Sequence, residues 1–69
     1  MTDVNEIIRA LMRAEPFRPY VIHTQDGREY EVESPENCGC SVDGSRIVVF
    51  SGGAMHILDA RSVTAIGEA

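Results

Sequence analysis

The sequence predicts a mainly β (α+β) fold, in which an N-terminal helix precedes a strongly bent five-stranded antiparallel sheet that curls into a small barrel. Three observations predict this fold. Apolar residues recur at helical spacing only within the first fifteen residues. After Pro19, short apolar runs alternate with glycine-containing turns, as is typical of strands. The 69 residues allow one domain, 1–69, and are too few to cover both faces of an open sheet.

The helix is predicted over about residues 3–14. Asp3 and Glu6 resemble a capping box, with Thr2 as an alternative N-terminal cap. Pro16 disfavours helical backbone in the residue before it, so the helix should end just before this proline. Its apolar stripe at i, i+3, i+4, i+7 and i+8 consists of Val4, Ile7, Ile8, Leu11 and Met12.

The strands are predicted from apolar runs between turn signals. The turn signals are Asp26-Gly27, Asp43-Gly44 and Ser51-Gly52-Gly53. The strands should lie at about 20–25, 28–33, 45–50, 54–58 and 63–66, with a weaker candidate at 38–42.

The first hairpin can be assigned a register. A three-residue loop with Gly27 in the left-handed region pairs Ile22 with Tyr30, which places apolar side chains on one face. A two-residue loop would instead pair Ile22 with Glu31, so burial favours the longer loop. The predicted core comprises Val4, Ile7, Ile8, Leu11, Tyr20, Ile22, Tyr30, Val32, Ile47, Val49, Ile57, Val63 and Ile66.

Two later strands, 47–50 and 55–58, carry apolar residues on both faces. Either the sheet curls into a barrel or a second subunit covers the remaining surface, and both can hold together. The leading hypothesis is therefore a non-catalytic, self-associating interaction module that forms a homo-oligomer through its last two strands. The predicted oligomer interface comprises Met55, His56, Ile57, Leu58, Val63, Thr64 and Ile66.

The charge balance is acidic. Eleven acids, six arginines and no lysine give a formal charge of −5, which argues against a surface that binds phosphates or anionic lipid. Five of the acids lie between residues 26 and 36, and three of these, Glu29, Glu31 and Glu33, alternate as expected for a solvated strand face. The sequence shows no apolar run of about 20 residues and no signal-like start, so we expect no membrane contact and a cytoplasmic location.

The cysteines and histidines leave two interpretations open. A zinc-binding domain, the second alternative function, would need Cys38, Cys40, His23 and His56 to assemble as the four ligands. Otherwise the cysteines are reduced thiols beside a strand, and the histidines are a solvated residue and a hydrogen-bonded strand residue. No nucleophile accompanies His56, so we predict neither an enzyme nor a bound cofactor.

The helix at 3–14, the stretch 21–27 with its Asp-Gly ending and the tail 55–66 together resemble the Sm-like family. The resemblance implies an SH3-like small barrel that closes into a ring, and makes an RNA-binding ring the first alternative function. RNA contact would require one rim to gather Arg18, Arg28, Arg46 and Arg61. Bacterial members of the family carry a basic Tyr-Lys-His-like element where this chain reads 57–59 as Ile-Leu-Asp, so we do not expect nucleic acid as a partner.

A second resemblance rests on the Pro-Phe-Arg-Pro motif at 16–19 and on the later stretch 56–59. Together these are similar to a family of small bacterial proteins of unknown function. This resemblance implies a bacterial protein and names no protein partner.

Overall fold

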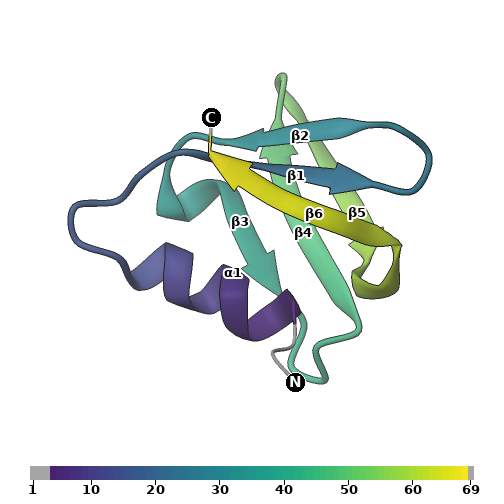
Figure 1. The fold of residues 1–69 in the computed structure, drawn as a ribbon, viewed down its shortest axis with the longest axis horizontal. Helices are drawn as coiled ribbons and strands as arrows, with labels where there is room; N and C mark the ends of the chain where they lie inside the picture. The colour runs from purple at the N-terminus through teal and green to yellow at the C-terminus, as the bar shows by residue number, and fades with distance from the viewer. Residues whose placement is uncertain (1–3, 69) are drawn as a thin grey trace.

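The computed structural model describes residues 4–68, which form one helix and six strands in two three-stranded antiparallel sheets (Figure 1). The strand order is β2-β1-β6 in one sheet and β3-β4-β5 in the other. The predicted mainly β class with one helix is therefore confirmed. The elements are α1 (Val4–Arg13), β1 (Tyr20–Thr24), β2 (Glu29–Val32), β3 (Cys38–Cys40), β4 (Arg46–Ser51), β5 (Ala54–Asp59) and β6 (Val63–Glu68).

Residues 4–68 do not form the predicted five-stranded barrel. Their six strands belong to two separate sheets, and no strand pairing joins these sheets into a closed barrel. Two short 3-10 turns, η1 (Pro35–Asn37) and η2 (Ala60–Ser62), account for the division. Each turn separates strands that belong to different sheets. Pro35 also lacks the N–H that a continuous ladder would need. The weak strand candidate at 38–42 is the short β3.

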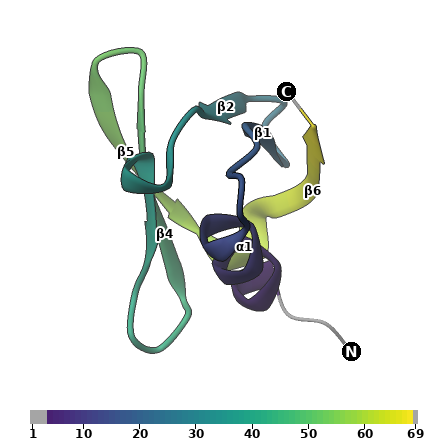
Figure 2. The same ribbon diagram turned by 90° about the vertical axis from the view of Figure 1, so that its left-hand side faces the viewer.

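Helix α1 lies across one end of the two sheets (Figure 2). It ends at Arg13, as the proline predicts, whereas the expected caps Thr2 and Asp3 lie outside the described residues. Ile8 is fully buried, but Ile7, predicted as core, is 38% exposed, because successive helical residues point about 100° apart. No helix among the described residues is long and apolar enough to cross a membrane.

The first hairpin has the predicted register. Tyr20 pairs with Val32 and Ile22 with Tyr30, so these four side chains share the buried face. Gly27 has a φ of +83°, the left-handed conformation that the three-residue loop requires. Burial of one face therefore selected this register.

The second hairpin corrects one core assignment. The predicted loop was the three residues Ser51-Gly52-Gly53, but Ser51 pairs with Ala54, which leaves a turn of two residues. Both glycines have positive φ, +63° and +79°, as a type I′ turn requires. The one-residue difference inverts the faces of β5, so Ile57 is exposed and Leu58 is buried.

The core lies between the two sheets and beneath α1. Val4, Leu11, Val63 and Ile66, all predicted as core, are partly buried and pack against its edge. Cys38 belongs to the core although the sequence did not indicate it, and Leu58 takes the place of Ile57. The buried apolar residues are Ile8, Tyr20, Ile22, Tyr30, Val32, Cys38, Ile47, Val49 and Leu58.

Candidate interaction surface

The two histidines lie in separate surroundings. The His23 Nδ1 lies 3.6 Å from the Glu29 Oε1 at the β1–β2 surface. The ring of His56 packs 4.9 Å from that of Tyr30, and its Nε2 lies 3.3 Å from the Ser51 carbonyl oxygen. Within residues 4–68, no group of three or more His, Cys, Asp or Glu side chains could hold a metal ion. The structure thus does not bring the four candidate zinc ligands together.

The two cysteines lie on β3, where Cys38 is buried and Cys40 is half-buried. Burial raises the pKa of the Cys38 thiol. The nearby Tyr20 hydroxyl is also buried, and burial together with the Cys38 side chain raises its pKa. Because the thiolate is the form that binds metal or attacks an electrophile, the raised pKa makes Cys38 a poor ligand and nucleophile near neutral pH.

The β4–β5 hairpin carries an exposed apolar surface on the side that faces away from the core. Phe50, Met55 and Ile57 are 48%, 58% and 57% exposed. Figure 2 shows no other described element beyond this side of β4 and β5. We call this surface the outer hairpin face, and by strand alternation it consists of Arg46, Val48, Phe50, Met55, Ile57 and Asp59.

The residues of the outer hairpin face form direct cross-strand pairs. Phe50 lies opposite Met55, and Val48 lies opposite Ile57, so the apolar part is continuous across both strands. At the end away from the turn, Arg46 lies opposite Asp59. At this end of the apolar patch, a positively charged and a negatively charged side chain therefore lie opposite each other.

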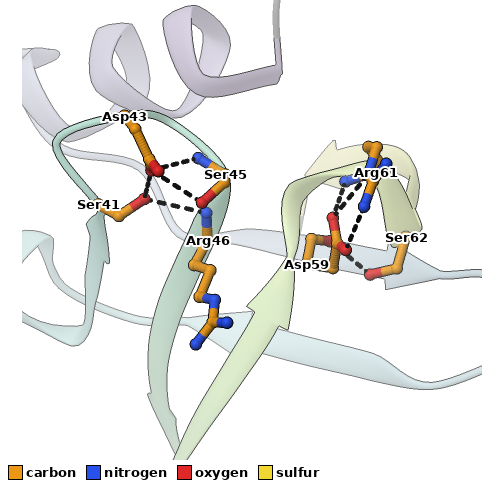
Figure 3. Close-up of polar contacts among 7 residues, drawn as sticks. All are labelled: Ser41, Asp43, Ser45, Arg46, Asp59, Arg61 and Ser62. Atoms are coloured by element: carbon orange, nitrogen blue, oxygen red, sulfur yellow. Dashed lines mark hydrogen bonds and ion pairs between the residues drawn. The ribbon is translucent and has the colours of Figure 1, made fainter.

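Asp59 is further tied to the turn that follows it. Its carboxylate accepts hydrogen bonds from the Arg61 backbone N–H, at 2.9 Å, and from the Arg61 guanidinium, at 3.2 Å (Figure 3). These bonds, with a smaller contribution from the charge of Arg46, lower the pKa of Asp59. The carboxylate therefore stays ionised and belongs to the corner between β5 and β6.

Asp43 plays a similar part in the β3–β4 turn. Its Oδ1 accepts hydrogen bonds from the Ser41 hydroxyl at 2.7 Å, the Ser45 N–H at 2.9 Å and the Ser45 hydroxyl at 2.8 Å. These bonds lower its pKa to about 2. Figure 3 shows the carboxylate directed into its own loop, so it stabilises the turn and presents no open site.

The predicted oligomer interface is divided by the structure. Met55 and Ile57 are exposed, whereas Leu58 is buried and His56 is half-buried against Tyr30. β5 and β6 are each the outermost strand of their sheet, which leaves one backbone edge of each outside the described ladders. On β6, Thr64 is exposed, and the half-buried members of the predicted set are Val63 and Ile66.

Sequence reasoning did not assign Val48 and Phe50 to the interface, although both lie on the outer hairpin face. A usable signal was present, because Ile47 and Val49 were predicted as core and the residues between and after them must point outward. The apolar surface is therefore wider than the predicted one and includes β4.

The structure does not bring together all four arginines proposed for an RNA-binding rim, although Arg46 and Arg61 both lie beside Asp59. The Arg28 Nε lies 3.4 Å from Asp26 Oδ2, and Arg61 is bonded to Asp59. Arg18 lies in the connector between α1 and β1, at the opposite end of the molecule from the β1–β2 turn (Figure 1). Two of the four positive charges are therefore paired with carboxylates, and a third lies apart.

Comparison with known proteins identified no relative of this chain. No protein-family model matches the chain, and neither a curated protein nor a solved structure matches it.

Proposed function

We propose that this protein is a non-catalytic, self-associating interaction module that acts as a homo-oligomer. The observation that carries the proposal is the outer hairpin face, where three large apolar side chains stand about half-exposed in one continuous patch. Each Å² of apolar surface removed from water contributes about 25 cal/mol, so covering this patch favours association. Contiguous exposed apolar patches commonly mark interaction sites.

The open strand edges support the same proposal. β5 contributes Met55 and Ile57 to the patch and is also the outermost strand of its sheet. Its outer backbone edge offers N–H and C=O groups that a strand of another copy can pair with. β6 offers a second such edge on the other sheet. The last two strands thus provide both apolar contact and hydrogen-bonding capacity.

Sedimentation equilibrium over a range that includes tens of micromolar tests the proposal. We expect a mass of at least twice that of the chain, and we expect Ile57→Lys to shift the protein towards monomer. Val42→Lys is the matched control, because Val42 is a fully exposed apolar residue in the β3–β4 turn and is not one of the residues of the outer hairpin face. A wild-type protein that stays monomeric would refute self-association.

An RNA-binding, Sm-like ring is the alternative that the resemblance suggests. Phosphate neutralisation supplies most non-specific RNA affinity, and two of the four candidate arginines are paired with aspartates. No contact among the described residues favours this function over self-association. Binding of single-stranded RNA at 150 mM salt that weakens as salt is added would revive it.

A further inference from the structure

We propose that Cys38 and Cys40 form a binding site for a soft monovalent metal ion, Cu(I), which their two thiolates hold between them. The site is independent of self-association, because neither cysteine belongs to the outer hairpin face. Thiolate sulfur is the ligand that Cu(I) prefers in proteins. Two sulfurs in a nearly linear arrangement can hold Cu(I), whereas a structural zinc ion takes four ligands, a number that residues 4–68 do not bring together.

The two cysteine side chains lie on the same face of β3. One residue of the strand separates them, so both point to the same side. In the ladder with β4, Cys38 lies opposite Val49, and Cys40 lies opposite Ile47. Both partners are fully buried, and directly opposed residues share a face. The two thiols therefore lie together on the core side of the sheet.

The spacing of the two cysteines suits a bridging metal better than a disulfide. Residues i and i+2 of an extended strand have Cα atoms about 7 Å apart, the limit beyond which a disulfide forms only if the backbone moves. Two metal–sulfur bonds in line span about 4.6 Å, if each is about as long as a zinc–sulfur bond. Nothing lies within 4 Å of a Cβ added to Gly39, so the strand has room to adjust between the two ligands.

The Tyr20 hydroxyl is a second, independent observation that points to a ligand here. The side chain is 2% exposed, and its buried oxygen has no hydrogen-bond partner among residues 4–68. The hydroxyl lies beside the Cys38 thiol, at a position from which it would donate to the ionised sulfur. A thiol is a weak acceptor, whereas an ionised group accepts a much stronger hydrogen bond. A metal-bound thiolate at Cys38 would therefore give this buried donor the acceptor that it lacks.

Binding exchanges two protons for one metal ion. Each cysteine loses its S–H proton to solvent, two copper–sulfur bonds form, and copper keeps its oxidation state. Burial of Cys38 opposes the loss of its proton and so disfavours metals that bind sulfur weakly, which leaves a soft ion that binds sulfur strongly. Cys40 is half-buried and β3 is the outermost strand of its sheet, so the metal can reach the pair from this edge.

Titration with Cu(I) under argon, in competition with a chromogenic Cu(I) chelator, tests the site. We expect one copper per chain, with two sulfur neighbours in its X-ray absorption spectrum. Cys40→Ser should weaken binding by at least about a hundredfold, the upper end of the loss caused by residues that only support a ligand. This variant changes the less buried cysteine, so the test does not depend on whether Cys38→Ser folds. His23→Ala and Met55→Leu are the matched controls, because each removes another soft donor and should leave the affinity unchanged.

Tyr20→Phe separates the role of the hydroxyl from the packing of the ring. The variant keeps the ring and removes a hydroxyl that has no partner, so the metal-free protein should unfold at the same urea concentration as the wild type or a higher one. Its affinity for Cu(I) should nevertheless fall by about 10–100-fold. An unchanged affinity would overturn the assignment of Tyr20 to the site.

Three results would overturn the site itself. They are a wild-type protein that takes no Cu(I) from the chelator, a Cys40→Ser variant that binds as tightly as the wild type, and a ratio of one copper to two chains. The last result would place the metal between cysteines of different chains. Sedimentation of the metal-free protein tests self-association separately, so the failure of one proposal is distinguishable from the failure of the other.

Discussion

The side-chain Nδ2 of Asn5 in α1 donates a hydrogen bond to the carbonyl oxygen of Gly44 in the β3–β4 turn. Asn5 is 4% exposed, and Gly44 has a φ of +75°. A Cβ added to Gly44 would lie 3.0 Å from that same nitrogen. The helix and the turn therefore meet at a position where an added side chain would crowd the amide.

We expect Asn5→Ala to lower the free energy of unfolding by about 1–3 kcal/mol, because it removes a buried hydrogen-bond donor. Urea denaturation followed by circular dichroism measures the change. A loss within about 0.3 kcal/mol of zero would contradict a structural role for this bond.

Gly44→Ala should destabilise the protein more than Gly27→Ala does. Both glycines have positive φ, so each alanine carries a similar conformational cost of about 1–2 kcal/mol. Only at Gly44 does the added methyl group also crowd Asn5, because nothing lies within 4 Å at Gly27. Equal losses in urea denaturation would show that the turn or the helix moves aside without cost.

The two faces of the second hairpin should respond differently to truncation. Ile47→Ala should lower the free energy of unfolding by about 2–5 kcal/mol, because Ile47 is fully buried. Ile57→Ala should change the stability of the monomer by no more than about 0.5 kcal/mol, because Ile57 is largely exposed. The comparison is made at a concentration where sedimentation shows monomer. Similar losses at both positions would contradict the observed register.

Asp43 should make stability depend on pH in the acid range. Its pKa is lowered to about 2 in the folded protein, so its ionised form favours folding above the ordinary aspartate pKa. That contribution is lost as the pH falls from about 4 through about 2. Asp43→Asn, which has no titrating carboxyl, should melt at a lower temperature than the wild type at pH 5, and the difference should shrink towards pH 2.

Glu31→Gln is the matched control for the pH experiment, because it removes one charge from the exposed face of β2. A difference in melting temperature between the wild type and Asp43→Asn that stays constant from pH 5 to pH 2 would contradict the lowered pKa.

Cys38 should react slowly with thiol reagents while the protein is folded. Burial raises the pKa of its thiol and shields it, so little thiolate is available near neutral pH. The variant Cys40→Ser leaves this single thiol, and its reaction with a disulfide reagent at pH 7 is measured with and without denaturing urea. We expect the reaction to be at least about tenfold faster in urea. Equal rates would contradict the burial of Cys38.

Local patterns predicted much of the fold. The stripe in α1 and the loop before Arg28 each have one arrangement that buries apolar side chains, so periodicity identified them. The division into two sheets depends on η1 and η2, where a few residues redirect the chain. Such a change of direction leaves no periodic signal, and so the sequence predicted one curled sheet instead.

The candidate surface was predicted only in part, for a related reason. The sequence indicated strands that are apolar on both sides, but a turn one residue shorter than expected decided which side of β5 faces outward. Ile57 and Leu58 have similar size and hydrophobicity, so neither residue alone reveals its face. The bond from Asn5 to Gly44 spans 39 positions and had no local signal at all.

The length of the two-glycine turn in the second hairpin determines which side chains of β5 lie on the surface of the molecule. Inserting a single codon between Ser51 and Ala54 would exchange Ile57 and Leu58 between surface and interior. Substitutions on the outer hairpin face would adjust the contact gradually, whereas a change of turn length would replace the whole β5 contribution at once. Variation by insertion or deletion is therefore far more disruptive here than variation by substitution.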